Sequence, residues 1–464
     1  MKHLQTRMIP VDPALKHLGT ALHADKMLGV FQQRLYADKS IRIVACHIER
    51  IKYKPQKNCH VSYRLCIRDD KCNDQTEQLV CSRFYEQGGS TARFFKEKGK
   101  TSVADTLLHI PELDCVTWIF PHDRKLTHLA QIVDAGFLQR NVMPVIVAKY
   151  AGAGWSIKNF QAAMIRYVPE QSCSVRAELE IVHPDSGNRR NFVVYGKTCY
   201  NHHGQRVLQL MQQLWRCPAS QEHTLHVPRP LLYQPRLRML WQLEVPGRTL
   251  SELCGNADLF FYAIANTARQ VALLHRVPLH DCPDTKPYQE LQELDKVRQL
   301  LHKFNAPQRN AIILLIERLE ALFSSTRPEQ RATLHGDLHL KNILVDGTQV
   351  HLIDLDNISQ GNPLRDIGSF IAAIINLALL GSISGQLAEQ AIEVFLHAYS
   401  GVAHHSVDSR QLRNYIVLAL VVERIFRSFT RLKTGRMEII ENLARQAQNI
   451  LDDSFTPIWL QGGD

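Results

Sequence analysis

The feature that most constrains the fold of this chain is an internal repeat. Residues 51–65 read IKYKPQKNCHVSYRL and residues 165–179 read IRYVPEQSCSVRAEL, with identical residues at six positions. In both copies a proline-containing turn is followed by a run in which every second residue is apolar, from Cys59 to Leu65 and from Cys173 to Leu179. This period of two predicts a β-hairpin with one buried face in each copy. Chance similarity is the alternative for so short a stretch.

The residues that follow each hairpin extend the similarity. A further strand is expected at residues 79–85 in the first copy and at residues 192–200 in the second, followed in each by a glycine-containing turn and a helix. Trp118 and Trp241 then occupy matching strands. We therefore predict a duplicated sheet-and-helix unit, in which residues 40–130 and 155–250 superpose.

The patterns divide the 464-residue chain into three expected domains, residues 1–150, 151–247 and 248–464. The first boundary falls in the small-residue stretch YAGAGWS at residues 150–156, and the character of the sequence changes to helix after Gly247. Apolar periodicity predicts helices at residues 259–274, 288–304 and 309–323 and from 365 to 451, with a strand-rich interruption at residues 333–356.

Composition narrows the class of protein. Hydrophobic residues make up 45% of the chain and charged residues 22%, which excludes a disordered chain or a coiled coil. The net charge of +10 is compatible with anionic partners without choosing among them. No apolar run is long enough for a membrane span, no secretory signal is visible, and the eleven cysteines form no CxxC pair. We expect reduced thiols and a cytoplasmic location; the oligomeric state stays open.

The chemistry-bearing segment is the strand-rich interruption, TLHGDLHLKNILVDGTQVHLIDLDN. Two short strands, residues 343–345 and 350–353, are joined by a turn, so a hairpin brings Asn342 and Asp354 together with Asp337 nearby. Two oxygen ligands suit Mg²⁺, and the remaining carboxylate can accept the proton of a hydroxyl that attacks a γ-phosphate. The alternative is that Asp337 and Asp354 only cap turns.

These motifs resemble those of the aminoglycoside phosphotransferase and choline kinase-like family. HGDLHLKN at residues 335–342 is similar to the catalytic loop of that family, IDLD at residues 353–356 to its metal-binding strand end, and GNPLRDI at residues 361–367 to the segment that follows. The resemblance is strong over residues 250–372, moderate over residues 160–247, and rests on the repeat alone before residue 150.

The resemblance implies an α+β, bilobal protein kinase-like fold with a mainly β ATP lobe, a mainly α substrate lobe and an extra N-terminal copy of the β-rich lobe. It implies ATP and Mg²⁺ as cofactors, Asp337 as the general base, and Asn342 and Asp354 as the metal ligands. Asp366 would brace the catalytic loop, as would His335, and His339 would orient it. Asp356 stands where many relatives carry glycine, so it is either a second metal ligand or a solvated turn residue.

The second copy of the repeat is the expected ATP lobe. Lys197 ends an apolar strand, where it either reaches the α- and β-phosphates or is simply solvated. Residues 242–245 resemble the hinge that pairs with adenine through its backbone, which assigns Gln242, Glu244 and Val245 to the nucleotide. The turn at residues 169–172 has no glycine, and the helix at residues 205–216 has no acid to pair with Lys197. In the first copy, arginine or serine replaces the lysine, which predicts a degenerate copy without catalysis.

The substrate side is basic. Residues 410–436 contain seven arginines and lysines against Glu423 alone, which argues against a polycationic aminoglycoside acceptor. A neutral or anionic sugar-like compound fits better; a solvated helix face with a protein or membrane contact is the alternative. A small-molecule kinase is therefore the leading function, and a pseudokinase that acts as a nucleotide-binding scaffold is the second. Nucleic-acid binding lacks any supporting motif, so no nucleic-acid partner is expected. ATP and GTP are not distinguished.

Overall fold

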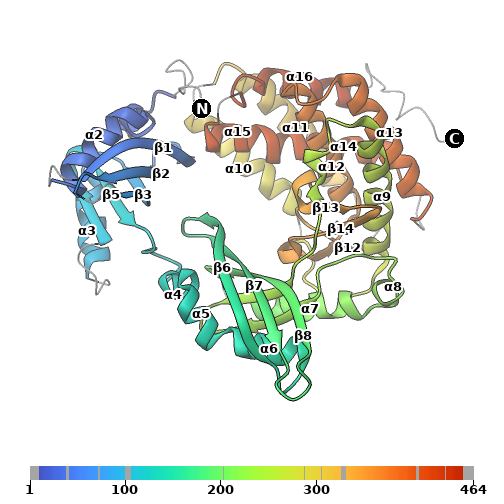
Figure 1. Ribbon diagram of the computed structural model, residues 1–464. Helices are drawn as coiled ribbons and strands as arrows, with labels where there is room; N and C mark the ends of the chain where they lie inside the picture. The colour runs from blue at the N-terminus through green and yellow to red at the C-terminus, as the bar shows by residue number, and fades with distance from the viewer. Residues whose placement is uncertain are drawn as a thin grey trace.

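The computed structural model describes residues 10–37, 41–71, 74–99, 106–201, 203–286, 288–304, 306–325, 331–403, 407–433 and 435–452. Two five-stranded antiparallel sheets precede a mainly helical part, and the three surround the centre of the molecule (Figure 1). The expected α+β class is confirmed. No helix in the described ranges is long and apolar enough to cross a membrane.

The first unit, residues 10–119, is built on the sheet of β1 to β5 with strand order β1-β2-β3-β5-β4. Helix α2 packs on β1, α1 packs on α2, and α3 follows β3. The bounds are α1 Leu18–Ala21, α2 Ala24–Leu35, β1 Ile41–Lys54, β2 Asn58–Asp69, β3 Asp74–Tyr85, α3 Gly89–Lys98, β4 Leu107–Ile110 and β5 Cys115–Ile119.

The second unit, residues 122–243, has the same strand order, β6-β7-β8-β10-β9, as the repeat predicts. Three helices precede its sheet and two follow β8. The bounds are α4 Leu129–Val133, α5 Ala135–Asn141, α6 Met143–Ala151, β6 Ser156–Val168, β7 Ser172–Val182, β8 Arg189–Cys199, α7 Gly204–Arg216, α8 Pro218–Gln221, β9 Pro230–Gln234 and β10 Met239–Leu243.

One buried aspartate holds the hairpin turn in each unit. In the first unit Asp12 Oδ2 accepts a hydrogen bond from the Tyr53 hydroxyl at 2.7 Å and another from the Gln56 backbone N–H at 2.8 Å. The same contacts recur in the second unit, at 2.7 and 2.8 Å, between Asp123 and the pair Tyr167 and Glu170. Burial makes these bonds costly to lose, so they fix the turns in equivalent positions.

The two aspartates also show where each unit begins. The sequence DPALKHL at residues 12–18 matches DRKLTHL at residues 123–129 in four positions. Leu126, Leu129 and the apolar faces of α5 and α6 pack in one cluster with Cys173, Val175 and Trp241 of the second sheet. Because residues 123–151 share the core of the second sheet, we propose a boundary near residue 121 in place of the one expected at residue 150.

The two tryptophans lie on equivalent strands, β5 and β10, as expected, but their positions along these strands differ by one residue. Trp241 pairs with Gly196, whose counterpart in the first unit is Ser82, and Ser82 pairs with Thr117. A shift of one residue turns a side chain to the other face of a sheet, so Trp118 packs outside the core that its own hairpin forms. Gly196 makes room for Trp241, because a Cβ there would lie 2.7 Å from the Trp241 ring.

The helical part, residues 248–452, carries two small sheets, β11-β13-β14 and β12-β15, against its helices. Its bounds are β11 Arg248–Thr249, α9 Ala257–Arg276, α10 Gln289–Lys303, α11 Arg309–Ser325, β12 Ala332–Leu334, β13 Ile343–Asp346, β14 Gln349–Leu352, β15 Ser359–Gly361, α12 Leu364–Leu379, α13 Gly385–Ser400, α14 Ser409–Ala419, a π-helical segment Leu420–Ile425, α15 Phe426–Arg431 and α16 Ile440–Leu451.

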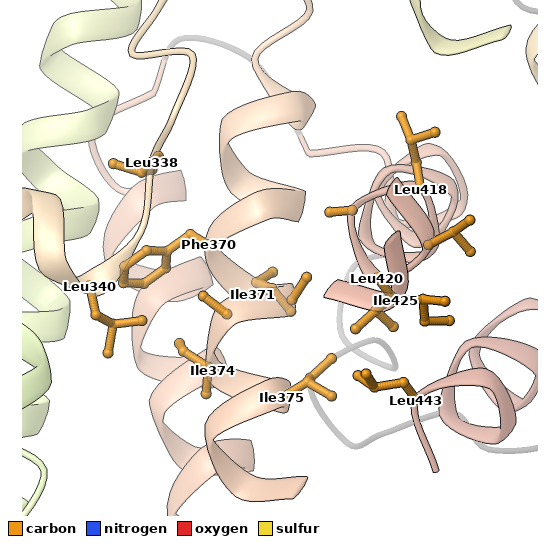
Figure 2. Packing of buried hydrophobic residues seen from close by; sticks show 14 of the residues in the cluster. Leu338, Leu340, Phe370, Ile371, Ile374, Ile375, Leu418, Leu420, Ile425 and Leu443 are labelled. Carbon is orange, nitrogen blue, oxygen red and sulfur yellow. The ribbon is translucent and has the colours of Figure 1, made fainter. Parts of the chain in front are cut away.

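Helix α12 is the centre of this part. It is buried along most of its length, and Figure 2 shows Ile371 and Ile375 facing Leu420, Ile425 and Leu443 of the C-terminal helices. On its other side Phe370 lies beside Leu338 and Leu340. The burial of these two leucines anchors the loop on α12, and Asp337, the residue before Leu338, lines a cavity shared with the second unit.

Candidate active site

The loop at residues 335–342 joins β12 to β13 and places the polar residues of the motif. The Ile353 backbone N–H donates to the Asn342 carbonyl oxygen at 3.0 Å, so the hairpin β13–β14 returns beside the loop. Asp354 follows directly in the left-handed conformation, with φ of 62°, which aspartate tolerates better than most residues. The hairpin therefore brings Asn342 and Asp354 together as expected.

Asp337 presents its carboxylate to solvent-accessible space. Its backbone carbonyl accepts a hydrogen bond from Asn342 Nδ2 at 2.9 Å, which fixes the loop and leaves the Asn342 side-chain oxygen for another partner. Two basic side chains lie near it: Arg427 Nη2 is 3.7 Å from Oδ1, and His339 Nε2 is 3.8 Å from Oδ2. Both distances exceed a hydrogen bond, so the carboxylate can accept a proton from an incoming group.

The pKa of His339 is shifted from its ordinary value. Burial and the charges of Arg424 and Arg427 lower the pKa of His339, although Asp337 opposes the change. The neutral imidazole is thus favoured near pH 7. A neutral His339 adds no positive charge beside the Asp337 carboxylate.

Lys197 pairs with two carboxylates of the helical part. Its Nζ lies 2.5 Å from Asp354 Oδ1 and 2.6 Å from Asp356 Oδ2. The partner that helix α7 does not supply therefore comes from the segment after β14. Asp356 therefore faces the same site, which favours the ligand alternative for this residue over the solvated turn, and Lys197 is ion-paired and not simply solvated.

Lys197 stabilises the charges of both carboxylates, whereas the two carboxylates repel each other. Burial alone would lower the pKa of Lys197, but Asp356 and Asp354 raise it, so the lysine stays protonated. Burial raises the pKa of Asp356, with Asp354 adding to the rise, whereas the Lys197 charge and hydrogen bond lower the pKa of Asp354 in spite of its burial. Asp354 is therefore the more strongly ionised carboxylate of the pair.

Asp366 holds the start of the loop at residues 335–342 in place. The side chain, only 2% exposed, accepts the backbone N–H groups of His335 at 2.6 Å and Gly336 at 3.0 Å, and it lies 3.2 Å from His275 Nε2. His335 Nε2 in turn contacts the Ile353 carbonyl oxygen at 2.9 Å. Gly336 has φ of 78°, and a Cβ there would lie 2.3 Å from the Asn357 carbonyl oxygen. Only glycine fits this turn.

Replacing Asp366 by alanine should lower the free energy of unfolding by about 3–5 kcal/mol, because two backbone donors and a histidine lose a buried acceptor. Asp408 is the matched control: it also accepts two backbone N–H groups, those of Arg410 and Gln411, but it is exposed. Asp408→Ala should cost about 1 kcal/mol. Urea unfolding of both variants measures the difference, and equal losses would contradict the bracing role.

The stability difference between the wild type and Asp366→Ala should also depend on pH. Burial would raise the pKa of Asp366, but the hydrogen bond from His275 and the His335 N–H lower it below the ordinary value. A depressed carboxyl pKa stabilises the fold above the unfolded pKa of about 3.9 and loses that contribution as the pH falls through the folded pKa. The stability gap between wild type and Asp366→Ala should therefore narrow below about pH 4.

The expected hinge is only partly available to a ligand. The Glu244 backbone N–H donates to the Val193 carbonyl oxygen at 2.9 Å, and the Glu244 carboxylate binds Arg176 with Arg176 Nε 2.7 Å from Oε1. Gln242 lies inside the ladder of β10. Among the described residues the Val245 N–H has no hydrogen-bond partner, so it is the backbone donor that this segment leaves free.

The hairpin turn between β6 and β7 is held by one arginine of the first unit, Arg83, and by one of the second unit, Arg124, contacts that sequence reasoning missed. Arg83 Nη2 lies 2.6 Å from Glu170 Oε2, and Arg124 Nη2 lies 2.9 Å from the same oxygen. Against the effect of burial, Arg124 and Arg83 lower the pKa of Glu170 to about 2. Arg83 lies opposite His60 as Lys197 lies opposite Ser174, so the counterpart of the lysine is an arginine that binds the turn.

These residues line one cavity of about 930 Å³, which we call the Lys197 cavity. Asp337, Asp354, Asp356 and Lys197 lie on its walls, together with the β6–β7 turn and β1 of the first unit. Gln242, Glu244 and Val245 are not among its lining residues. Four of the seven predicted site residues therefore lie close together: Asp337, Asp354 and Lys197 line the cavity, and Asn342 lies behind Asp337. The three hinge residues lie outside the cavity lining.

Part of the sequence that forms the site matches a known protein family. Residues 202–408 match the model of the family described as "Phosphotransferase enzyme family". The predicted resemblance is confirmed over these residues. The matched segment contains the catalytic loop, both carboxylates beside Lys197, and Asp366. It supports the expected ATP-dependent phosphotransferase. No curated protein sequence matches the chain significantly.

Several solved kinases are similar in structure. The amicoumacin kinase hAmiN, in complex with AMP-PNP, Ca²⁺ and Ami, has a TM-score of 0.44 and 14% identity, covering 70% of this chain and 96% of its own. A thermostable mutant of aminoglycoside phosphotransferase APH(4)-Ia with AMP-PNP and hygromycin B has a TM-score of 0.45 and 15% identity, over 68% and 98%. Choline kinase from Cryptosporidium parvum has a TM-score of 0.45 and 10% identity, over 69% and 99%.

Proposed function

We propose that this protein transfers the γ-phosphate of ATP to a hydroxyl group of a small, neutral or anionic, sugar-like compound. The observation that carries the proposal is the shared wall of the Lys197 cavity, where the free carboxylate of Asp337 faces the same space as Asp354, Asp356 and Lys197. Phosphoryl transfer to an alcohol requires a proton acceptor for the hydroxyl, close to charged side chains and oxygen ligands for the phosphates and a metal ion.

Asp337 acts as the general base in this proposal. Its carboxylate takes the proton from the acceptor hydroxyl while the hydroxyl oxygen bonds to the γ-phosphorus and the bond from that phosphorus to the β–γ bridging oxygen breaks. Asn342 holds the backbone of Asp337, and Asp366 holds the start of the loop, so the carboxylate stays in place without being engaged by either. His339 and Arg427 flank the carboxylate and orient it.

The residues present fit a magnesium ion. The Asn342 amide nitrogen is used by the Asp337 carbonyl, so its oxygen is left for a ligand, and Asp354 with Asp356 adds carboxylate oxygens. Mg²⁺ favours a few such oxygens and completes its shell with water and phosphates. When bound, the metal would neutralise charge on the β- and γ-phosphates. Asn342 and Asp354 would hold it, with Asp356 as a further ligand.

The nucleotide is held by the second unit in this proposal. Lys197 is protonated and lies between the two carboxylates, so its charge can turn to the phosphates when nucleotide and metal arrive. The free N–H of Val245 would pair with adenine, whereas Gln242 and Glu244 support the segment from within the sheet. ATP is the expected nucleotide, with GTP as the comparison.

The proposal is tested by calorimetric titration with ATP and GTP, with and without Mg²⁺, followed by transfer from γ-labelled ATP to a panel of hydroxylated metabolites. We expect Mg²⁺-dependent nucleotide binding and labelling of at least one acceptor. A protein that binds no nucleotide in the presence of Mg²⁺ would contradict the proposal. Tight binding without transfer to any acceptor would favour the nucleotide-binding scaffold.

A further inference from the structure

The first unit reaches the helical part beside the catalytic loop. Helix α15 packs on β1, and the Phe304 ring lies between Tyr53 of β1 and Phe429 of α15, with centroid distances of 6.1 and 4.7 Å. In Figure 1 the end of β1 points toward α15 and α10. Since Arg83 of β3 binds Glu170 in the β6–β7 turn, the first unit also contacts the second unit on the other side of the site.

The facing surfaces of β1 and α15 are lined with cations. Strand alternation puts Arg50, Lys52 and Lys54 on the face opposite the buried Tyr53. Helical spacing of four residues puts Arg427 and Arg431 on one face of α15. A cavity of about 430 Å³ lies between them; we call it the α15 cavity. Lys52, Lys54, Arg427 and Arg431 line it, and Asp337 lies on its wall.

The α15 cavity adjoins the Lys197 cavity without coinciding with it. Lys52, Lys54 and Asp337 line both, so the two meet at the carboxylate of the proposed base. Arg427 and Arg431 line only the α15 cavity, whereas Lys197 and Asp354 line only the other. A group bound by Arg431 is therefore on the far side of Asp337 from the nucleotide residues, where the acceptor must lie.

The protein neutralises only part of the positive charge of the α15 cavity, where Arg427 lies 3.7 Å from Asp337 Oδ1. Within the part of the chain that the structure describes, Lys52, Lys54 and Arg431 form no ion pair. Two of the acids that line the cavity are engaged elsewhere, Glu293 with Arg365 and Glu423 with Arg424 and Ser369. Like charges at close range repel one another, so an anionic ligand between β1 and α15 would be bound favourably.

The titration of these groups agrees with this geometry. Burial and the neighbouring charges of Lys54, Arg431 and Arg50 lower the pKa of Lys52 to about 8. Burial, Arg431 and Arg166 lower the pKa of Arg50 to about 10. An anion bound between β1 and α15 would remove this mutual repulsion.

We propose that the phosphate acceptor carries an anionic group, a phosphate, sulfate or carboxylate, which binds Lys52, Arg427 and Arg431 in the α15 cavity while its hydroxyl meets Asp337. This inference rests on the proposed phosphotransfer and narrows its acceptor to an anionic compound. The volume of the cavity suits a small molecule. The first unit thereby gains a function: β1 supplies part of the acceptor site.

The experiment uses the full chain saturated with Mg²⁺ and AMP-PNP, so that the nucleotide site is filled, and titrates it with inorganic phosphate by calorimetry. The variants are Arg431→Met and Lys52→Met, one on each wall. Each should weaken phosphate binding about 10–100-fold, the value of a charge-assisted hydrogen bond. The control is Lys149→Met, which removes an exposed cation on α6 and should bind phosphate like the wild type.

Stability and nucleotide binding separate the possible outcomes. Ligand-free Arg431→Met should melt no lower than the wild type, because it removes repulsion and no ion pair. Wild-type affinity for phosphate in both variants, or no phosphate binding by the AMP-PNP-saturated wild type, would overturn the anionic acceptor while normal AMP-PNP binding leaves the phosphotransferase standing. Failure of the wild type to bind Mg²⁺ and AMP-PNP would instead overturn the phosphotransferase itself.

Discussion

Replacing Asp354 by alanine should lower phosphoryl transfer to about one thousandth of the wild-type rate or less, because the metal loses its charged ligand and several kcal/mol of transition-state stabilisation. Asp354 has φ of 62°, where alanine is strained. Asp354→Gly removes the carboxylate without that strain. Both variants should be inactive and should need more Mg²⁺ to bind ATP. Steady-state rates and Mg²⁺ titrations measure these effects.

The matched control lies at the other end of the same hairpin. Asp346 is an exposed aspartate at the β13–β14 turn, away from Lys197, and Asp346→Ala should keep wild-type activity. Should Asp354→Gly retain full activity while Asp354→Ala loses it, the left-handed backbone would matter and the carboxylate would not. That result would remove Asp354 from the proposed metal ligands.

Replacing Asp337 by asparagine should cut turnover by about 10²–10⁴-fold and leave nucleotide binding nearly unchanged. The amide has the shape of the carboxylate but cannot take the proton of the attacking hydroxyl. The structure supports an intact fold, since the loop is held by the Asp337 backbone carbonyl and by Asp366 and not by the Asp337 side chain. Melting temperature, Mg²⁺–ATP affinity and single-turnover rates test the three parts of this expectation.

Two other results are possible for Asp337→Asn, and each has its own meaning. A variant that turns over at the wild-type rate would show that another group takes the proton. A variant that loses ATP binding together with its fold would return Asp337 to the role of a buried turn cap. Asp346→Asn serves as the control for a change from carboxylate to amide that lies outside the site.

Much of the candidate site was accessible to sequence reasoning because its signals are local. The catalytic loop, the β13–β14 hairpin and Asp354 lie within about twenty residues, so strand and turn patterns suffice to bring Asn342 and Asp354 together. The repeat likewise predicts two sheets, since alternation over a hairpin is a property of consecutive residues. Family resemblance then supplies the chemistry of HGDLHLKN.

The hinge shows where such reasoning is insufficient. Position in the sequence assigns Gln242, Glu244 and Val245 alike to adenine, yet the ladder of β10 with β8 and β9 occupies the first two. Which backbone groups remain free depends on strand register. A register shift of one residue also separates Trp118 from Trp241, although both tryptophans stand on matching strands.

By itself the sequence determined the duplicated unit, the α+β class and the loop that carries Asp337, because each follows from spacing between neighbouring residues. Only the tertiary structure decided the partners of Lys197, which lies 157 residues before Asp354. The same holds for the binding of Glu170 by Arg83 and Arg124, and for the cationic cavity between β1 and α15. The physical reason is that an ion pair or a cavity wall joins residues that share no local pattern. Their meeting depends on how the first unit packs across the site, and packing is decided by the burial of surfaces far apart in the chain.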